Sequence, residues 1–185
     1  MACEQVALDR RGIKMKVIFV RHGEPDYSEL EERSYTGFGL DLAPLSEQGR
    51  LQAQELCQHP LLRSADLLVS SAVTRALETA SYVACATGLP LRVEPLLHEW
   101  QVYERGRENF EKARSLFLEN NGALLLSSPI QYETAEEMRA RFVDCMAKYR
   151  DYQTVVLVAH RMLIRQFVPD ETIDFCQVIE CDIEI

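Results

Sequence analysis

The 185-residue sequence lacks an apolar run long enough to cross a membrane, which argues against an integral membrane protein. It also lacks an excess of positive charge, because its formal net charge is −9 and its pI is about 5.0. This acidity argues against the basic surface that binds nucleic acid or anionic lipid. We therefore expect neither a nucleic-acid partner nor a membrane partner, and the sequence leaves the oligomeric state open.

Patterns that hold metal ions or form disulfides are missing too. The six cysteines are scattered without a Cys-x-x-Cys pair, and no histidine has the His-x-His or His-Glu-x-x-His spacing of a zinc site. Residues 1–14 contain no apolar segment of the kind that a secretory signal needs. We therefore expect a cytoplasmic protein with reduced thiols, no metal and no other cofactor.

The composition fits one ordinary enzyme domain, since 47% of the residues are hydrophobic and 26% are charged. We expect a loose N-terminal arm over residues 1–14 and a single domain over residues 15–185. Within that domain, short apolar segments alternate with helical patterns. This order predicts the α/β class, as a three-layer α/β/α sandwich with a mostly parallel central sheet and an edge strand at the C-terminus.

The expected elements follow from hydrophobic pattern and capping residues. Fully buried strands are predicted at residues 17–20 and 155–159, further strands at 66–70 and 91–94, and an alternating, half-buried edge strand at 178–185. Helices are predicted from Ser46 onward, over 73–87 and 106–120, and after a capping box formed by Thr134 and Glu137. Residues 25–44, which contain several prolines and glycines, are predicted to be a long loop.

Two of the predicted strands end on a histidine. Residues 17–20 lead into Arg21 and His22, and residues 155–159 lead into His160. Parallel strands deliver the residues that follow them to the carboxyl edge of the sheet, where open α/β folds bind ligands. Arg75 lies in the first turn of the helix after a third strand, where free backbone N–H groups also favour an anion. These residues together predict a phosphate site.

The residue types suit phosphoryl transfer through a histidine. A neutral imidazole can attack phosphorus and form a phosphohistidine, which water then hydrolyses. Arginine forks bind the oxygens of the transferred group. A carboxyl group is needed to protonate the leaving oxygen, and Glu99, in the loop after the strand at 91–94, is placed for that work.

The motifs resemble those of the histidine phosphatase superfamily, also called phosphoglycerate-mutase-like. The resemblance runs in order along residues 15–185. It rests on Arg21-His22-Gly23-Glu24, on residues 44–53 (PLSEQGRLQA), on residues 70–80 (SSAVTRALETA), on Glu133-Thr134 and on the strand ending at His160. The resemblance implies that His22 is the nucleophile, that Arg21, Arg75 and His160 hold the phosphoryl group, that Glu99 is the proton donor, and that no metal is needed.

Three positions depart from the family pattern. Arg161 and Met162 stand where the family usually has two glycines, and Ser28 stands where it often has an asparagine. The usual Gly-x-Trp-Glu-Gly type of sequence after the acid is also missing, so the role of Glu99 rests on its order along the chain. We expect Ser28 and Arg161 to join the substrate-binding residues.

These observations predict a phosphomonoesterase that hydrolyses a small phosphorylated metabolite through phospho-His22. Three alternatives remain. One is a phosphoglycerate-type mutase, although the segment between Glu99 and Glu133 is short for a closing lid. Another is a phosphatase that acts on phosphohistidine proteins. The third is a non-catalytic domain that binds a phosphorylated ligand for regulation.

Overall fold

The computed structural model describes residues 14–103, 107–168 and 172–185 as an α/β domain built on a five-stranded sheet. The strands are β1 (Lys14–Arg21), β2 (Leu67–Ser71), β3 (Leu91–Glu94), β4 (Thr154–Ala159) and β5 (Val178–Glu184). The helices are α1 (Ser28–Glu32), α2 (Glu47–Leu56), α3 (Thr74–Thr87), α4 (Arg107–Glu119), α5 (Ala135–Met146) and α6 (Arg161–Ile164). Short 3-10 segments are η1 (Gly37–Leu42), η2 (Pro60–Ser64), η3 (Pro95–Leu97) and η4 (Ala147–Tyr149).

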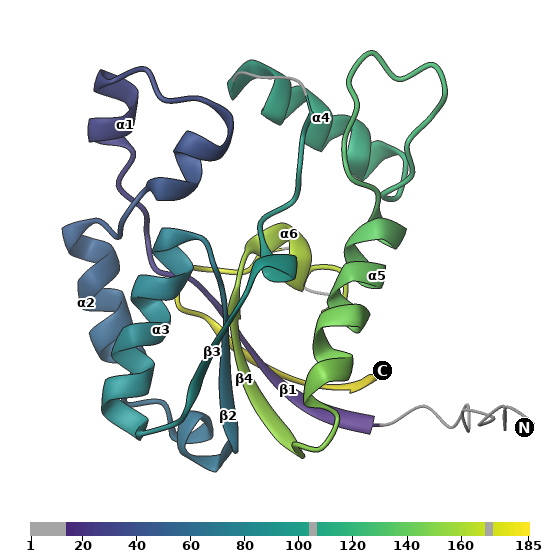
Figure 1. The fold of residues 1–185 in the computed structure, drawn as a ribbon. Coiled ribbons are helices and arrows are strands. Elements are labelled where there is room, and N and C mark those ends of the chain that lie inside the picture. The colour runs from purple at the N-terminus through teal and green to yellow at the C-terminus, as the bar shows by residue number, and fades with distance from the viewer. Residues whose placement is uncertain (1–13, 104–106, 169–171) are drawn as a thin grey trace, which may run out of the picture.

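The sheet has the strand order β3-β2-β4-β1-β5 (Figure 1). The pairs β3–β2, β2–β4 and β4–β1 are parallel, and β5 pairs antiparallel with β1 at the edge. The predicted mostly parallel sheet with a C-terminal edge strand is therefore confirmed. β1 begins at Lys14, so one residue of the predicted N-terminal arm belongs to the sheet; the rest of that arm lies outside the described residues.

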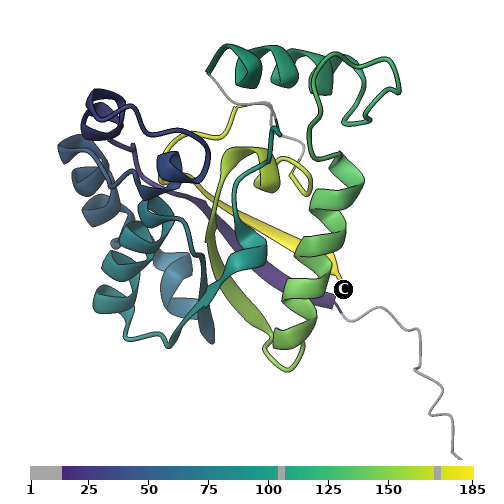
Figure 2. The ribbon, with the colours of Figure 1, turned by 45° about the horizontal axis from the view of Figure 1, so that its top comes forward.

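Helices cover both faces of the sheet, as a three-layer sandwich requires. Figures 1 and 2 show α2 and α3 on one face and α5 on the other. Alternate residues of β1 serve the two cores: Ile18 and Val20 pack with α3, whereas Val17 and Phe19 pack with α5. Both cores are apolar and buried, which holds the carboxyl edge of the sheet in a fixed position.

Local sequence signals explain where the helices begin and end. The Ser46 side chain accepts a hydrogen bond from the backbone N–H of Gly49 at the start of α2, and Thr134 and Glu137 form the predicted capping box of α5. Helix α3 ends at Gly88, whose φ of +73° is left-handed and favours glycine. These three boundaries agree with the prediction.

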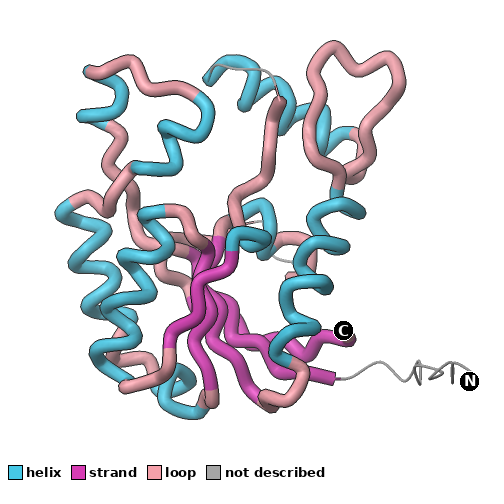
Figure 3. The backbone as a smooth tube through the Cα atoms, in the orientation of Figure 1, coloured by secondary structure: helices cyan, strands magenta, loops and turns pink. Residues whose placement is uncertain are grey.

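The segment at 25–44 differs from the prediction of a continuous loop. It contains α1 and η1, which are too short for a hydrophobic period to show in the sequence. Figure 3 shows these two short helical pieces in a long connection that rises beyond the sheet, with α4 standing on the other side. α1 and α4 thus flank the carboxyl edge of the sheet.

No helix within the described residues is long and apolar enough to cross a membrane.

Candidate active site at the carboxyl edge of the sheet

His22 follows β1 directly and is almost fully buried, with 4% of its surface exposed. Its Nδ1 lies 2.7 Å from the carbonyl oxygen of Gly23. Because a carbonyl only accepts hydrogen bonds, Nδ1 carries the proton and Nε2 keeps its lone pair. Burial, followed by the nearby Arg75, lowers the pKa of His22 well below its usual value, so the ring is neutral. A neutral imidazole with an unprotonated Nε2 is the form that attacks phosphorus.

Backbone packing fixes the turn that carries His22. A Cβ atom at Gly23 would lie 2.7 Å from the carbonyl oxygen of Gly49, and one at Gly49 would lie 2.1 Å from that of Glu24. Both glycines are therefore needed for the close approach of this turn to the start of α2. The backbone N–H of Gly23 donates to Thr79 of α3 at 3.0 Å.

Arg75 brings a guanidinium to His22 from the first turn of α3. Its Nε donates to Nε2 of His22 at 3.3 Å, and only 4% of its surface is exposed. Its Nη1 is buried without a hydrogen-bond partner among the described residues and has only a longer ionic contact with Asp41, at 3.7 Å. A buried N–H group with no hydrogen bond is costly, so Arg75 is ready to bind an anion beside His22.

Arg21 is the second guanidinium of the site. Its Nη1 donates to the carbonyl oxygen of Ile173 at 2.7 Å, and the guanidinium lies 3.8 Å from the ring centre of Phe175. These two contacts hold the side chain in place, while its Nε is buried without a hydrogen-bond partner in the described part of the chain. Arg21 thus offers a second N–H group for an anion.

His160 follows β4 and is completely buried. Its ring centre lies 5.1 Å from that of His22, and its Nε2 lies 2.9 Å from the hydroxyl oxygen of Ser71. The Ser71 hydroxyl also accepts from the backbone N–H of Val73, and its own O–H is available to donate to Nε2 of His160. Burial lowers the pKa of His160 well below its usual value. In the tautomer where Nε2 accepts from Ser71, Nδ1 carries the proton; Nδ1 is buried without a partner among the described residues and can then donate to an anion.

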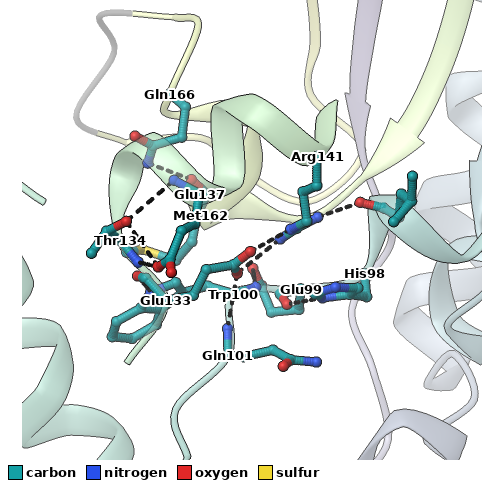
Figure 4. Close-up of polar contacts among 11 residues, drawn as sticks. His98, Glu99, Trp100, Gln101, Glu133, Thr134, Glu137, Arg141, Met162 and Gln166 are labelled. Carbon is teal, nitrogen blue, oxygen red and sulfur yellow. Dashed lines mark hydrogen bonds and ion pairs between the residues drawn. The ribbon is translucent and has the colours of Figure 1, made fainter. Parts of the chain in front are cut away.

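Glu99 lies in the loop that follows β3 and η3, and this loop appears in close-up in Figure 4. One carboxylate oxygen accepts from the backbone N–H of Trp100 at 2.8 Å. Burial raises the pKa of Glu99, while Arg75 and Arg21 act in the opposite direction through their charges. A carboxyl group with a raised pKa near two arginines has the properties of a general acid.

A buried ion pair between Glu133 and Arg141 supports this loop (Figure 4). Arg141, in α5, donates to both carboxylate oxygens of Glu133 and to the carbonyl oxygen of Leu96. Glu133 in turn accepts from the indole N–H of Trp100 through its carbonyl oxygen and from the backbone N–H of Gln101 through its carboxylate. The loop is therefore tied to α5 on both sides of Glu99.

The two remaining predicted site residues, Ser28 and Arg161, make no contact with His22 that the structure records. Ser28 is exposed at the start of α1, where its backbone N–H donates to Asp26, and no contact joins it to His22 or either arginine. Arg161 is the first residue of α6, directly after His160, and is partly buried. It interacts electrostatically with Arg21, Glu99 and Asp174. The structure thus brings Arg161 close to the site and leaves Ser28 at its outer side.

The structure also adds residues that the sequence did not reveal. Asp41 contacts Arg75, and Phe175 lies against both Arg21 and His22. The side chain of Tyr27 interacts electrostatically with Arg75 and Glu99, and burial raises its pKa. His98, which precedes Glu99 in the same loop, interacts electrostatically with Asp41 and with His160. None of these residues belongs to a local sequence motif. They meet because the fold places segments that are far apart in the sequence side by side.

Metal binding has no obvious place in this arrangement. Over the described ranges 14–103, 107–168 and 172–185, no three or more His, Cys, Asp or Glu side chains form a group that could hold a metal ion. Independence from metal remains a prediction that needs an experiment.

Comparisons with known proteins agree with this geometry. The family model of the histidine phosphatase superfamily (branch 1) matches residues 17–170. A curated relative from Hydrogenobacter thermophilus, named "Putative phosphoserine phosphatase 2", is 29% identical over 157 residues, which cover 78% of this chain and 72% of the relative.

Two solved structures are similar as well. One, named "Mycobacterial hydrolase 1", has a TM-score of 0.63 at 28% identity, and the match covers 83% of this chain and 78% of that one. The other is a mycobacterial glucosyl-3-phosphoglycerate phosphatase in complex with VO3, with a TM-score of 0.61 at 27% identity and coverage of 82% and 78%. On the family match, the fold and the shared motifs, this chain belongs to the histidine phosphatase superfamily.

Proposed function

We propose that this protein is a phosphomonoesterase that hydrolyses a small phosphorylated metabolite through a phosphohistidine intermediate on His22. The observation that carries the proposal is the hydrogen bond from Nδ1 of His22 to Gly23, since it leaves Nε2 unprotonated beside Arg75. The family match supports phosphatase chemistry. Relatives whose names include phosphoserine and glucosyl-3-phosphoglycerate phosphatases support a phosphorylated metabolite as substrate.

The reaction has two steps in this site. Nε2 of His22 attacks phosphorus, the phosphorus–oxygen bond to the leaving group breaks, and protonated Glu99 gives its proton to the leaving oxygen. Water then attacks the phosphohistidine, Glu99 takes back a proton, and inorganic phosphate leaves with His22 restored. Arg21, Arg75 and His160 donate hydrogen bonds to the phosphoryl oxygens during both steps, where charge builds up.

We expect vanadate and phosphate to inhibit hydrolysis of p-nitrophenyl phosphate competitively, with no effect of EDTA on the rate. The buried, unpaired N–H groups of Arg21 and Arg75 are the reason for the first expectation. Arg75→Met should raise the inhibition constant of vanadate at least about tenfold, because a charged hydrogen bond contributes roughly 1.5–3 kcal/mol. Arg92→Met, which changes an exposed arginine on β3, is the matched control. Activity that disappears with EDTA and returns with a divalent cation would contradict this prediction.

Arg161 is proposed to bind a second anionic group of the substrate, because it stands directly after His160 and interacts with Arg21 and Glu99. Arg161→Gly should raise the KM of a phosphate ester that carries a carboxylate by about tenfold, on the scale of a charged hydrogen bond. The KM of p-nitrophenyl phosphate should change far less. Arg150→Ala, which removes an exposed arginine of another segment, is the control. Equal responses of the two substrates would show that Arg161 does not select the substrate.

A further inference from the structure

The guanidinium of Arg21 lies where several forces oppose its presence. Burial lowers the pKa of Arg21, and the positive charges of Arg161 and Arg75 act in the same direction. Two carboxylates attract the group instead, Glu99 in the site and Asp174, which is exposed. A long side chain under these forces is drawn toward solvent and toward the exposed carboxylate. Keeping Arg21 in the phosphate site therefore requires contacts that hold it there.

One segment, residues 173–177, supplies these contacts from two directions, and we call it the strap. The carbonyl oxygen of Ile173 accepts from Nη1 of Arg21 at 2.7 Å, which fixes the direction of the guanidinium within its own plane. The ring centre of Phe175 lies 3.8 Å from the guanidinium carbon, which sets the tilt of that plane. The same ring borders His22, at 5.8 Å between ring centres. Both rotations of the guanidinium are thus restricted.

The backbone of the strap is itself bound to the end of β1. The N–H of Cys176 donates to the carbonyl oxygen of Arg21 at 3.0 Å and to that of His22 at 3.4 Å, and the N–H of Arg21 donates to the carbonyl oxygen of Gln177 at 3.2 Å. Cys176 has a φ of +57°, in the left-handed region that a cysteine rarely adopts. These hydrogen bonds therefore hold a backbone conformation that its sequence disfavours, and they fix the residue that carries the Phe175 ring.

We propose that Phe175 is a positioning residue, whose ring keeps the Arg21 guanidinium turned into the phosphate site. The inference rests on the proposed phosphatase function, in which Arg21 binds the phosphoryl oxygens. Phe175 acts through Arg21 and makes no contact with the phosphate. An aromatic face attracts a cation without offering an oxygen that would compete with phosphate for its N–H groups. The ring therefore holds the arginine and leaves its buried Nε available to an anion.

The test measures vanadate binding by calorimetry in four proteins: wild type, Phe175→Leu, Arg21→Met and the double variant. Phe175→Leu should raise the dissociation constant of vanadate about fivefold or more, because the contact between the ring and the cation is lost. In the Arg21→Met protein the same change should alter the constant by less than about twofold, because the group that Phe175 positions is gone. A residue that merely stabilises the fold would weaken binding equally in both backgrounds.

Two further variants serve as controls. Phe175→Tyr keeps the aromatic face and should bind vanadate within about twofold of wild type. Tyr152→Leu removes a ring two residues before β4, at the end of the sheet opposite to the site, and should leave the dissociation constant unchanged. Melting temperatures show whether each variant is folded. Phe175→Met, which brings a flexible apolar side chain, replaces the leucine variant if that protein does not fold.

Unchanged vanadate binding by the folded Phe175→Leu protein would overturn the proposal, as would equal losses with and without the Arg21 guanidinium. Loss of binding in Phe175→Tyr to the level of Phe175→Leu would overturn it too, and so would a wild-type protein that does not bind vanadate. Failure of the phosphatase function itself would be seen separately, as an absence of phosphate release from every ester, because the binding measurement needs no turnover.

Discussion

Replacing His22 with alanine is expected to lower kcat/KM for p-nitrophenyl phosphate by at least about three orders of magnitude, since removal of a nucleophile disables a catalytic unit. The nucleophilic Nε2 is the atom lost, while Arg21, Arg75 and His160 remain to bind the phosphate. Rapid quenching of the wild-type enzyme in alkaline detergent should reveal protein-bound phosphate that is stable in base and released by acid, as phosphohistidine is. The variant should show none.

The control is His59→Ala, which removes a histidine outside the group of His22, Arg21, Arg75 and His160 and should keep the rate within about twofold. Since His22 is buried, the melting temperature of the variant should be measured, and His22→Asn provides a second variant closer in volume. Residual turnover within about tenfold of wild type, equivalent to roughly 1.4 kcal/mol in the barrier, would exclude His22 as the nucleophile.

Replacing Glu99 with glutamine is expected to slow the hydrolysis of an alkyl phosphate by about 10²–10⁴-fold, the usual contribution of general acid catalysis. A nitrophenyl phosphate should slow far less, because nitrophenolate leaves without a proton. The comparison holds where formation of phospho-His22 limits the rate. Glu111→Gln on α4, whose side chain is exposed, is the control for loss of a carboxylate.

The pH dependence of the rate is a second test of the role of Glu99. Burial raises the pKa of Glu99, which keeps the carboxyl group protonated to higher pH than usual. The wild-type rate on an alkyl phosphate should therefore fall as pH rises through this pKa, because the carboxylate has no proton to give. In Glu99→Gln this alkaline fall should be absent. Equal slowing of both esters, with the pH profile unchanged, would assign Glu99 a structural role.

The strands and capped helices were predictable because each has a local cause. The apolar residues of β1 and β4, the Ser46 cap and the box of Thr134 and Glu137 act within one or two turns of chain. The meeting of His22, Arg75 and His160 also followed from local patterns, because parallel strands bring their carboxyl ends to one edge. The sequence was therefore enough to predict that these three side chains lie close together.

The outer part of the site could not be predicted in this way. Asp41 reaches Arg75 only because η1 folds back over the start of α3, and Phe175 reaches Arg21 from a segment more than 150 residues later. Neither segment has a hydrophobic period or a motif. Contacts of this kind leave no local signal in the sequence, whereas residues at the ends of strands do, so the centre of the site was easier to predict than its outer part.

The ion pair of Glu133 and Arg141 has a consequence for how the protein loses activity on warming. Arg141 donates a hydrogen bond to Leu96, and Glu133 accepts one from Gln101. The loop that carries Glu99 and helix α5 are therefore expected to open together as one cooperative unit. Opening of this unit would withdraw Glu99 but leave the turn of His22 packed on α2 through its glycines. A partly opened molecule would then still cleave esters with good leaving groups after it had stopped cleaving alkyl esters, so heat would change the enzyme's selectivity before it destroyed the enzyme.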